Sequence, residues 1–203
     1  MYIPKAFRED DINTLHKLMR EYSFATLITQ HEGVLFATHL PFILDARRGP
    51  NGTLLAHMAR ANPQWHDFVS AQEVLVIFQG PHAYISPFWY EVELSVPTWN
   101  YVVVHAYGPP RLIEDQVKLY NLLKTLIHTH EAHFEKPWPF NLPDDYLQKM
   151  MHGIVGFEIE ITRLEGKFKL SQNRTAIERE NVIAALQESS HTLAVADLMR
   201  SMD

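Results

Sequence analysis

The chain has 203 residues, a hydrophobic content of 46% and a formal net charge of −6, with 12 histidines and no cysteine. A chain of this length and composition can bury one sizeable core, so a disordered protein is disfavoured. The negative charge opposes tight non-specific binding to nucleic acid, which depends on cations set against phosphates. Without cysteine, disulfides, thiol nucleophiles and thiolate metal sites are excluded.

The N-terminal segment lacks the apolar core of a signal peptide. No later apolar run approaches the roughly 18 residues that a membrane-spanning helix needs. We therefore expect a cytoplasmic protein that does not associate with a membrane.

The first half of the chain is predicted to be rich in β-structure. In chain order, the patterns predict a helix over 10–22, strands over 23–29, 34–44 and 53–60, a short helix over 62–70, and strands over 73–79, 82–86 and 98–107. Pro41 cannot donate a ladder hydrogen bond, so the second strand should bend there or lie at a sheet edge. Asn62 is a favourable N-cap residue and Pro63 a favourable first residue, which together predict where the short helix begins.

The second half combines helices with further strand-like segments. In chain order, the patterns predict a helix over 116–133, a connector over 136–145, a strand over 155–161, a turn over 164–166, a strand-like segment over 167–171, and helices over 175–186 and 192–200. Thr175 and Glu178 have the spacing of a capping box. Six or seven strands, with helices mostly at the flanks, predict a mainly β fold. A small β-barrel with helical additions fits this order better than alternating βαβ units.

Polar and aromatic side chains are concentrated between residues 53 and 108. In the strand predicted over 98–107, alternation places five side chains on one face, and these are Trp99, Tyr101, Val103, His105 and Tyr107. Such a stripe is typical of a core or a subunit interface. With Asn100 nearby, it also suits a flat apolar slot edged by donors and acceptors, which is what a flavin ring needs.

The segment HMARANPQW, residues 57–65, contains a second polar feature. Arg60 ends a strand and is followed by a predicted helix N-terminus, whose free N–H groups and dipole favour an anion. The guanidinium adds a planar fork suited to phosphate oxygens. An ordinary strand-to-helix connection with a surface arginine explains the same pattern and is the commoner structure.

Familiar signatures of nucleotide, nucleophile and metal sites are absent or incomplete. The chain contains no G-x-G-x-x-G, no G-x-x-x-x-G-K-[ST] and no G-x-S-x-G motif. The segment HTHEAHF, residues 128–134, resembles a zincin helix, but Phe134 stands where the second histidine is required. A solvated helix face is therefore the preferred interpretation, and no metal site is predicted.

Taken together, these segments resemble a known family. MYIPKAF, FATLIT, THLPF, HMARANPQW, FQGPHAYISPFWY, VPTWNYVVVHAYG, IVGFEIEI and KLSQNR occur in this order over nearly the whole chain, and they are similar to the PaiB-type FMN-binding negative transcriptional regulators. The resemblance implies one FMN-binding split β-barrel domain over 1–203, with a C-terminal helical extension over about 175–203. This fold is related to pyridoxamine-phosphate oxidase and flavin reductases. A homodimer with FMN at or near the subunit interface, and a role in repressing protease production and sporulation, are also implied.

The resemblance further suggests which residues hold the cofactor. The phosphate and ribityl chain would contact the 57–62 segment, through His57, Met58, Ala59, Arg60 and Asn62. The ring would be bordered by Gln79 together with the partner subunit's Trp99, the partner subunit's Asn100 and the partner subunit's His105. The site would be closed by Lys169, Gln172 and Arg174. One departure is Phe88, which stands where a small residue such as serine is expected, and this change affects either access to the pocket or the choice of ligand beside Trp89.

Three functions are compatible with that fold. The first is a regulatory FMN-binding protein, in which the flavin or its redox state biases a dimer. The second is a flavin-dependent reductase or oxidase, although the sequence contains no recognisable acid–base pair. The third is haem binding or degradation, for which the histidines are the local support. The acidic charge and the lack of an obvious recognition helix predict that any contact with DNA is indirect or limited to a small patch.

Overall fold

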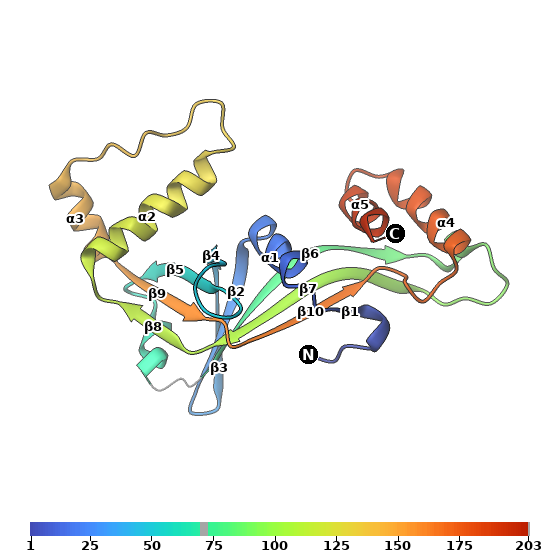
Figure 1. The fold of residues 1–203 in the computed structure, drawn as a ribbon, viewed down its shortest axis with the longest axis horizontal. Helices are drawn as coiled ribbons and strands as arrows, with labels where there is room; N and C mark the ends of the chain where they lie inside the picture. The colour runs from blue at the N-terminus through green and yellow to red at the C-terminus, as the bar shows by residue number, and fades with distance from the viewer. Residues whose placement is uncertain (70–72, 203) are drawn as a thin grey trace. The chain divides into compact units, whose positions relative to one another are not determined.

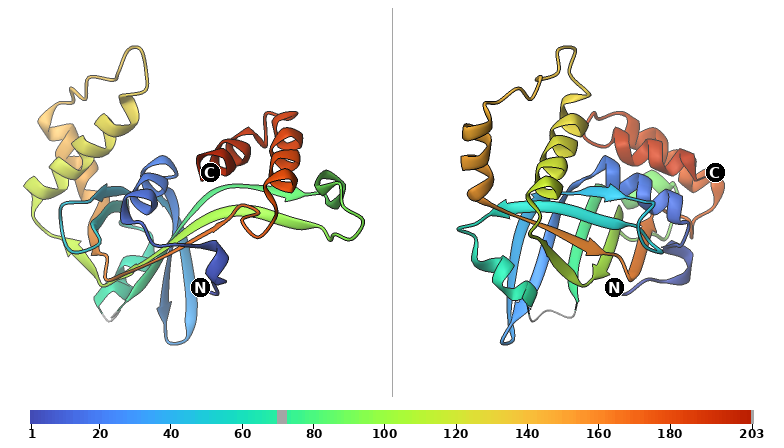
Figure 2. Two further views of the ribbon diagram at one scale, coloured as in Figure 1. Left: turned by 45° about the vertical axis from the view of Figure 1, so that its right-hand side comes forward. Right: turned by 60° about the vertical axis from the view of Figure 1, so that its left-hand side comes forward.

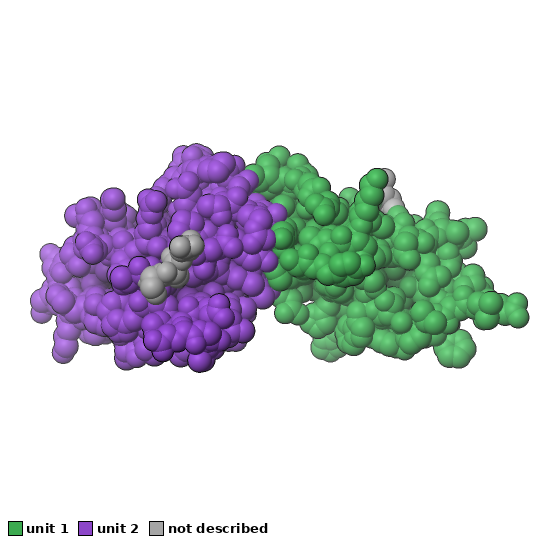
Figure 3. Space-filling model, turned by 90° about the horizontal axis from the view of Figure 1, so that it is seen from below, with its two compact units in different colours: residues 1–18, 79–105, 165–203 green, residues 19–78, 106–164 purple. Residues whose placement is uncertain are grey.

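The computed structural model describes residues 1–69 and 73–202, and two sheets form its framework (Figure 1). The chain divides into two compact units, which Figure 3 colours separately. Unit 1 comprises residues 1–18, 79–105 and 165–203, and unit 2 comprises residues 19–78 and 106–164. The ends of two predicted segments, Ser70 and Asp203, lie outside the described residues.

The strands account for most of the framework. They are β1 (Arg8–Glu9), β2 (Phe24–His31), β3 (Val34–Pro41), β4 (Ile43–Asp45), β5 (Thr53–Ala59), β6 (Val74–Ile85), β7 (Thr98–Gly108), β8 (Pro110–Ile113), β9 (Ile154–Glu160) and β10 (Arg163–Lys169). The α-helices are α1 (Ile12–Glu21), α2 (Gln116–Glu131), α3 (Asp144–His152), α4 (Ala176–Gln187) and α5 (Leu193–Ser201). Short 3-10 helices are η1 (Lys5–Phe7), η2 (Pro63–Val69) and η3 (Pro87–Tyr90).

The larger sheet has the strand order β1-β10-β7-β6-β2-β3, and the smaller sheet has the order β4-β5-β9-β8. β2 and β3 form a hairpin, and β3 is an edge strand that ends at Pro41. Directly after it the chain changes sheets, because Ile43 of β4 pairs with Leu55 of β5. The predicted effect of Pro41 is confirmed, since a residue without an N–H ends an edge strand here.

Phenylalanine side chains from several segments fill the interior of unit 2. Phe157 of β9 packs against Phe42, with ring centroids 6.2 Å apart, and against Phe68 at 5.0 Å. Phe42 also packs edge-on against Phe78 of β6 at 5.9 Å. Each ring removes a large apolar area from water, so this cluster stabilises the contact between the two sheets.

Helices α4 and α5 cover one face of the long strands of unit 1 (Figures 1 and 2). On that face β7 presents Asn100, Val102 and Val104, all fully buried. The two helices bury Val182, Ile183, Leu186, Val195, Ala196 and Met199. The predicted capping box at the start of α4 is confirmed, because Thr175 Oγ1 accepts from the Glu178 amide and the Glu178 carboxylate accepts from the Thr175 amide.

Helices α2 and α3 pack against the smaller sheet (Figure 2). In β9 the neighbouring residues Gly156 and Phe157 point to opposite faces, so the helices lie on the face opposite to the phenylalanine cluster. Their contact is a second apolar cluster, made of Leu119, Leu122, Leu126, Leu147 and Met151. Gly156 of β9 permits a close approach, since a Cβ there would lie 2.6 Å from Leu119 Cδ1. The missing side chain therefore lets α2 lie close to the strand.

The structure corrects several sequence predictions. β8 and α3 were not predicted, because β8 is short and begins with a proline, and α3 lies at the end of a segment that was taken as a connector. The predicted turn over 164–166 is wrong, since these residues belong to β10. Gly166 is needed for a close approach instead: a Cβ there would lie 2.6 Å from the Glu9 carbonyl oxygen of β1. The two strands predicted over 73–79 and 82–86 form the single strand β6.

The end of β7 supplies a test of this packing. A Cβ at Gly108 would lie 2.0 Å from the carbonyl oxygen of Glu160, which is backbone of β9 and can move only if the strand shifts. We expect Gly108→Ala to lower the free energy of unfolding by about 3 kcal/mol, measured by urea denaturation. Gly153→Ala is the control, because its nearest atom is the Met150 carbonyl oxygen at 3.3 Å, and it should cost less than about 1 kcal/mol. Equal losses in the two variants would contradict this account.

Candidate functional site

The open face of the long strands in unit 1 contains a concavity of about 530 Å³. It is lined by Gln79, His82, Trp99, Tyr101 and Val103. The last three alternate along β7 with the buried side chains that face α4 and α5, so strand alternation places them on the opposite face. The predicted aromatic stripe is therefore on the surface of this unit and not in its core.

A change in the alternation of β6 brings a histidine to the same face. Along this strand the buried positions are even-numbered up to Gly80 and odd-numbered from Ala83. One extra residue in a strand produces such a shift, and Pro81 at this point cannot donate to a neighbouring strand. As a result both Gln79 and His82 border the concavity. His82 was not predicted as a site residue, and Pro81 was the only signal for it in the sequence.

Trp99 is the largest side chain in the concavity and is 52% exposed. Its ring lies beside His82, with centroids 6.0 Å apart, and meets Tyr84 edge-on at 5.9 Å. These neighbours support the indole and leave about half of it accessible. The result is an apolar surface with an amide and an imidazole at its border, which suits a planar heteroaromatic ligand.

Asn100 lies on the opposite face of β7. Its side chain is fully buried, and its amide nitrogen donates to Ser171 Oγ at 2.9 Å and contacts Met199 Sδ at 3.4 Å. A buried amide is costly unless it is hydrogen-bonded, so Asn100 has a clear structural role in unit 1. His105 is on the Trp99 face by alternation, but it does not line the concavity.

Lys169 and Arg174 border a smaller, cationic pocket of about 210 Å³ in unit 1. Lys169 Nζ donates to the Thr98 hydroxyl and to the Trp99 carbonyl oxygen. Burial lowers the pKa of Lys169, and the positive charges of Lys167 and Arg174 lower it further. Arg174 is held by Glu178 at 3.2 Å, and its guanidinium lies 4.1 Å from the centroid of the Tyr90 ring.

Gln172 stabilises the turn that leads into α4. Its side-chain oxygen accepts from the Leu170 amide at 2.7 Å, and its side-chain nitrogen donates to the Phe168 carbonyl. Ser171 adopts a positive φ of 64°, which is uncommon for a residue other than glycine. These hydrogen bonds tie Gln172, which follows Ser171, to the end of the strand that precedes it, and they give the Gln172 side chain a structural role in unit 1.

The 57–65 corner belongs to unit 2, and Arg60 is its most engaged side chain. Its Nε donates to the His152 carbonyl and its Nη2 to the Ile154 carbonyl, both at 2.8 Å. Trp65 Nε1 donates to the Arg60 carbonyl at 3.0 Å. Arg60 therefore ties the corner to the junction of α3 and β9, and only part of its donor fork faces outward.

The predicted cap at Asn62 is confirmed. Its side-chain oxygen accepts from the Gln64 amide at 3.0 Å, and its side-chain nitrogen donates to Thr38 Oγ1 at 3.0 Å. The predicted short helix is the 3-10 helix η2. Because Asn62 already satisfies one of the first free amides, the helix start offers an anion less than the sequence suggested.

Two buried polar atoms at this corner have no partner within the described residues, and they are His57 Nδ1 and Gln64 Oε1. Such atoms are costly unless a ligand or water completes them. Met58, which follows His57 in the sequence, points into the interior and is 2% exposed, whereas Ala59 is exposed. The Gln64 side-chain oxygen is an acceptor, and His57 Nδ1 donates or accepts according to its tautomer. Both atoms therefore suit a ligand with groups that donate and accept hydrogen bonds, such as the hydroxyls of a ribityl chain.

The predicted site residues thus fall into separate groups. Gln79 and Trp99 share the aromatic concavity, and Asn100, Lys169 and Arg174 border the cationic pocket. The residues of the 57–62 segment lie together in unit 2.

The described residues form neither a metal-ligand cluster nor a membrane-spanning helix. Across residues 1–69 and 73–202, no group of three or more histidine, cysteine, aspartate or glutamate side chains converges as metal ligands would. The histidines of the 128–134 segment are exposed on α2 and just after it. No helix in the described part of the chain is long and apolar enough to span a bilayer.

Comparison with known proteins identifies the family. Residues 1–163 match the model of the family described as "Putative FMN-binding domain". The chain belongs to this family. It is 39% identical, over 98% of its own length and 96% of the relative's, to the Bacillus subtilis protein named "Protease synthase and sporulation protein PAI 2". The predicted relationship to PaiB-type proteins is confirmed, and the family match ends before Lys169, Gln172 and Arg174.

Solved structures share the fold at low sequence identity. The "FAD and Heme binding protein" from Mycobacterium smegmatis has a TM-score of 0.62 and 16% identity, covering 88% of this chain and 79% of that one. The "Flavocytochrome Anf3" from Azotobacter vinelandii has a TM-score of 0.60 and 13% identity, covering 86% and 73%. The predicted fold, a split β-barrel with helical additions, is confirmed.

The environment of His57 leads to a prediction about pH. Burial lowers the pKa of His57 below its ordinary value of 6.5, because desolvation disfavours the imidazolium. As the pH falls below 6.5, the unfolded chain takes up this proton before the folded chain does, so stability is lost until the folded pKa is passed. We expect His57→Gln to lose less stability than the wild-type protein between about pH 7 and 5.

Urea denaturation at a series of pH values measures this difference. His128→Gln, which removes an exposed histidine on α2, is the control and should follow the wild-type pH profile. A His57→Gln profile that parallels the wild-type profile would show that the buried imidazole does not contribute.

Proposed function

We propose that this protein is a cytoplasmic FMN-binding homodimer that acts as a negative regulator of transcription, controlling protease production and sporulation. The flavin assignment rests on the aromatic concavity around Trp99. It agrees with the description of the family to which the chain belongs, a putative FMN-binding domain. When bound, FMN supplies electron and hydride transfer chemistry. The protein's own residues bind it and orient it.

The concavity suits the isoalloxazine ring in shape and chemistry. Trp99 and Tyr101 offer aromatic surface, and Val103 extends the apolar floor. Gln79 and His82 stand at its border, where they can exchange hydrogen bonds with the polar edge of the ring. A volume of about 530 Å³ is within the range of about 300–1,000 Å³ that small-molecule sites occupy.

For the polar tail of FMN we propose the 57–62 corner. His57 Nδ1 is buried and unpaired within the described residues and is suited to a ribityl hydroxyl. Arg60 and Asn62 are anchored by the hydrogen bonds already described, so they form a rigid border with the remaining Nη1 of Arg60 available to a phosphate oxygen. Lys169 and Arg174 supply positive charge in unit 1, and we propose that they close the site.

The homodimer is supported by an apolar edge strand. β3 is the last strand of its sheet and exposes Val34, Leu35 and Phe36, while Phe24 of β2 is also exposed. An exposed edge strand with apolar side chains can pair with a strand of another chain, and soluble proteins usually protect such an edge from pairing. A second copy of this chain is the occupant that we propose, which would bring residues of two subunits to each flavin.

The regulatory role is supported by the relative from Bacillus subtilis, whose name refers to protease synthase and sporulation. The net charge of −6 disfavours extensive contact with DNA phosphates. We therefore propose that regulation proceeds through a flavin-dependent state of the dimer, with any DNA contact indirect or made by a limited patch.

Flavin titration tests the cofactor assignment. We expect FMN to bind the pure protein, and Trp99→Ala to weaken binding roughly tenfold through lost aromatic contact, measured by quenching of flavin fluorescence. Trp138→Ala is a matched control, because it removes an exposed tryptophan from unit 2. Light scattering on the same samples measures the mass of the assembly. A protein that leaves FMN fluorescence unchanged during titration would refute the assignment.

The regulator can be tested in Bacillus subtilis lacking its PAI 2 protein. Expression of this chain should lower secreted protease activity, whereas Trp99→Ala should be less effective and Trp138→Ala fully effective. Sustained oxidation of NAD(P)H by the FMN-loaded protein, with no effect on protease activity, would favour a reductase instead. Binding of FMN without turnover would agree with the regulatory assignment.

A further inference from the structure

A second cavity, of about 640 Å³, lies within unit 2 between α2 and the smaller sheet. Its walls come from β4 and the following turn, β5, β8, β9 and α2. It is lined by Ile43, Leu44, Asp45, Arg47, Arg48, Leu55, Ile113, Lys118, Asn121, Leu122, Thr125 and Glu158. None of these residues belongs to the aromatic concavity or to the 57–62 corner, so the cavity is not accounted for by the flavin site proposed above.

The floor of this cavity is apolar. Leu122 of α2 is 4% exposed, and Ile43, Leu55 and Ile113 from three strands of the smaller sheet pack against the same cluster. Farther along the cluster, the absence of a side chain at Gly156 of β9 allows α2 to lie close to the sheet. A floor of this kind favours the hydrocarbon part of a ligand, because apolar area is removed from water on binding.

The charges at the rim are unbalanced. Arg47 lies 3.6 Å from Asp45, and Arg48 Nη2 donates to Glu158 at 2.8 Å, so each carboxylate of the lining already has a cationic partner. Lys118 is the remaining charged group of the lining, and within the described residues it forms no ion pair. The cavity therefore presents one uncompensated positive charge above an apolar floor.

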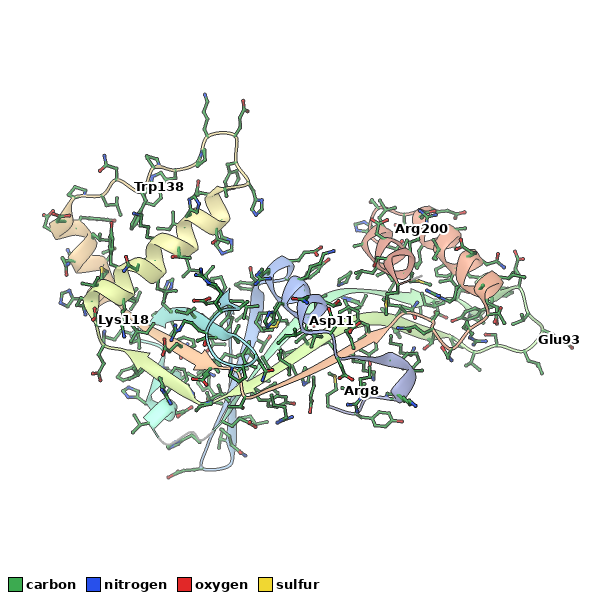
Figure 4. All side chains as sticks on the ribbon, in the orientation of Figure 1. Arg8, Asp11, Glu93, Lys118, Trp138 and Arg200 are labelled. Atoms are coloured by element: carbon green, nitrogen blue, oxygen red, sulfur yellow. The ribbon has the colours of Figure 1, made fainter. Side chains whose placement is uncertain are left out.

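The sequence of α2 directs this charge and two polar side chains toward the cavity. Lys118, Asn121, Leu122 and Thr125 follow the i, i+3, i+4, i+7 spacing of one helix face. Figure 4 shows Lys118 at the β8 end of α2. A cation in the first turn is disfavoured by the helix dipole, so helix stability does not explain Lys118 at this position.

We propose that this cavity binds a small amphipathic monoanion, a carboxylate with a hydrocarbon body. The carboxylate would contact Lys118 Nζ and the Asn121 amide, and the body would lie on Leu55, Ile113 and Leu122. The cavity volume is within the range of about 300–1,000 Å³ typical of small-molecule sites. This site does not depend on flavin binding.

Octanoate is a suitable probe, with 1-octanol as its neutral analogue. By isothermal titration calorimetry of the full chain, octanoate should bind the wild-type protein, and Lys118→Gln should weaken it roughly fivefold, the effect of losing about 1 kcal/mol of charge interaction. Lys124→Gln is a matched control on the same helix, because Lys124 is exposed and does not line the cavity. Binding of 1-octanol should be unchanged in both variants.

A blocking variant tests the position of the hydrocarbon. Thr125→Trp places a bulky side chain at the mouth of the cavity and should abolish binding of both octanoate and 1-octanol. Absence of octanoate binding to the wild-type protein, or equal affinities in wild type, Lys118→Gln and Thr125→Trp, would overturn the proposal.

FMN is itself an amphipathic anion, so it must be tested against the same variants. Lys118→Gln and Thr125→Trp should bind FMN as the wild type does, and FMN should not displace octanoate. Weaker FMN binding by both variants would place the flavin in this cavity and overturn the separate site. Weaker FMN binding only in Trp99→Ala would leave the two sites independent.

Discussion

The packing of phenylalanine rings between the two sheets of unit 2 is the contact on which the rest of the structure depends. Phe42, Phe68 and Phe78 approach this unit's interior from three different segments, and Phe157 joins two of them. The inner faces of β5 and β9 are buried, and β9 adds Phe157 to this cluster, so the outer faces of the two strands remain for α2, α3 and the second cavity. The same alternation fixes Met58 inside and leaves His57 on the other side, so the core determines which residues of the 57–62 segment are available to a ligand.

The alternation of side chains between two faces also determines which residues of β7 are available in unit 1. One face of the strand carries Asn100, Val102 and Val104 and is covered by the C-terminal helices. The opposite face carries Trp99 and Tyr101, and these are exposed enough to bind a ligand. The side-chain amide of Asn100 donates to Ser171 and contacts Met199, which stabilises the covered face. Asn100 therefore does not line the concavity. A ligand surface is thus available because helices cover only one side of the strand.

The polar corner shows how structure and binding compete for the same side chain. Arg60 was predicted to hold a phosphate, yet two of its nitrogens are bonded to carbonyls of His152 and Ile154. Arginine has five donors, so anchoring through two of them also fixes the orientation of the others. In the same corner the Asn62 cap satisfies the start of η2, whereas the buried His57 Nδ1 has no hydrogen-bond partner in the described part of the chain. Within the described residues, the unmet hydrogen-bonding capacity of this corner is therefore on His57 Nδ1 and Gln64 Oε1, which sequence patterns did not distinguish from their neighbours.

The sequence by itself determined the elements whose signals are local. The Thr175 capping box, the Asn62 cap, the end of β3 at Pro41 and the two faces of β7 all follow from side-chain chemistry within a few residues. Ordered motifs along the chain also determined the family. Tertiary structure alone decided that Gly166 serves a close approach to β1 and not a turn, and that α3 forms after the proline-rich segment. It also decided that a shift in β6 brings His82 beside Trp99, and that Lys118, which forms no ion pair with any described residue, borders an apolar cavity. These features depend on contacts between residues far apart in the chain, and local propensity carries no information about such partners.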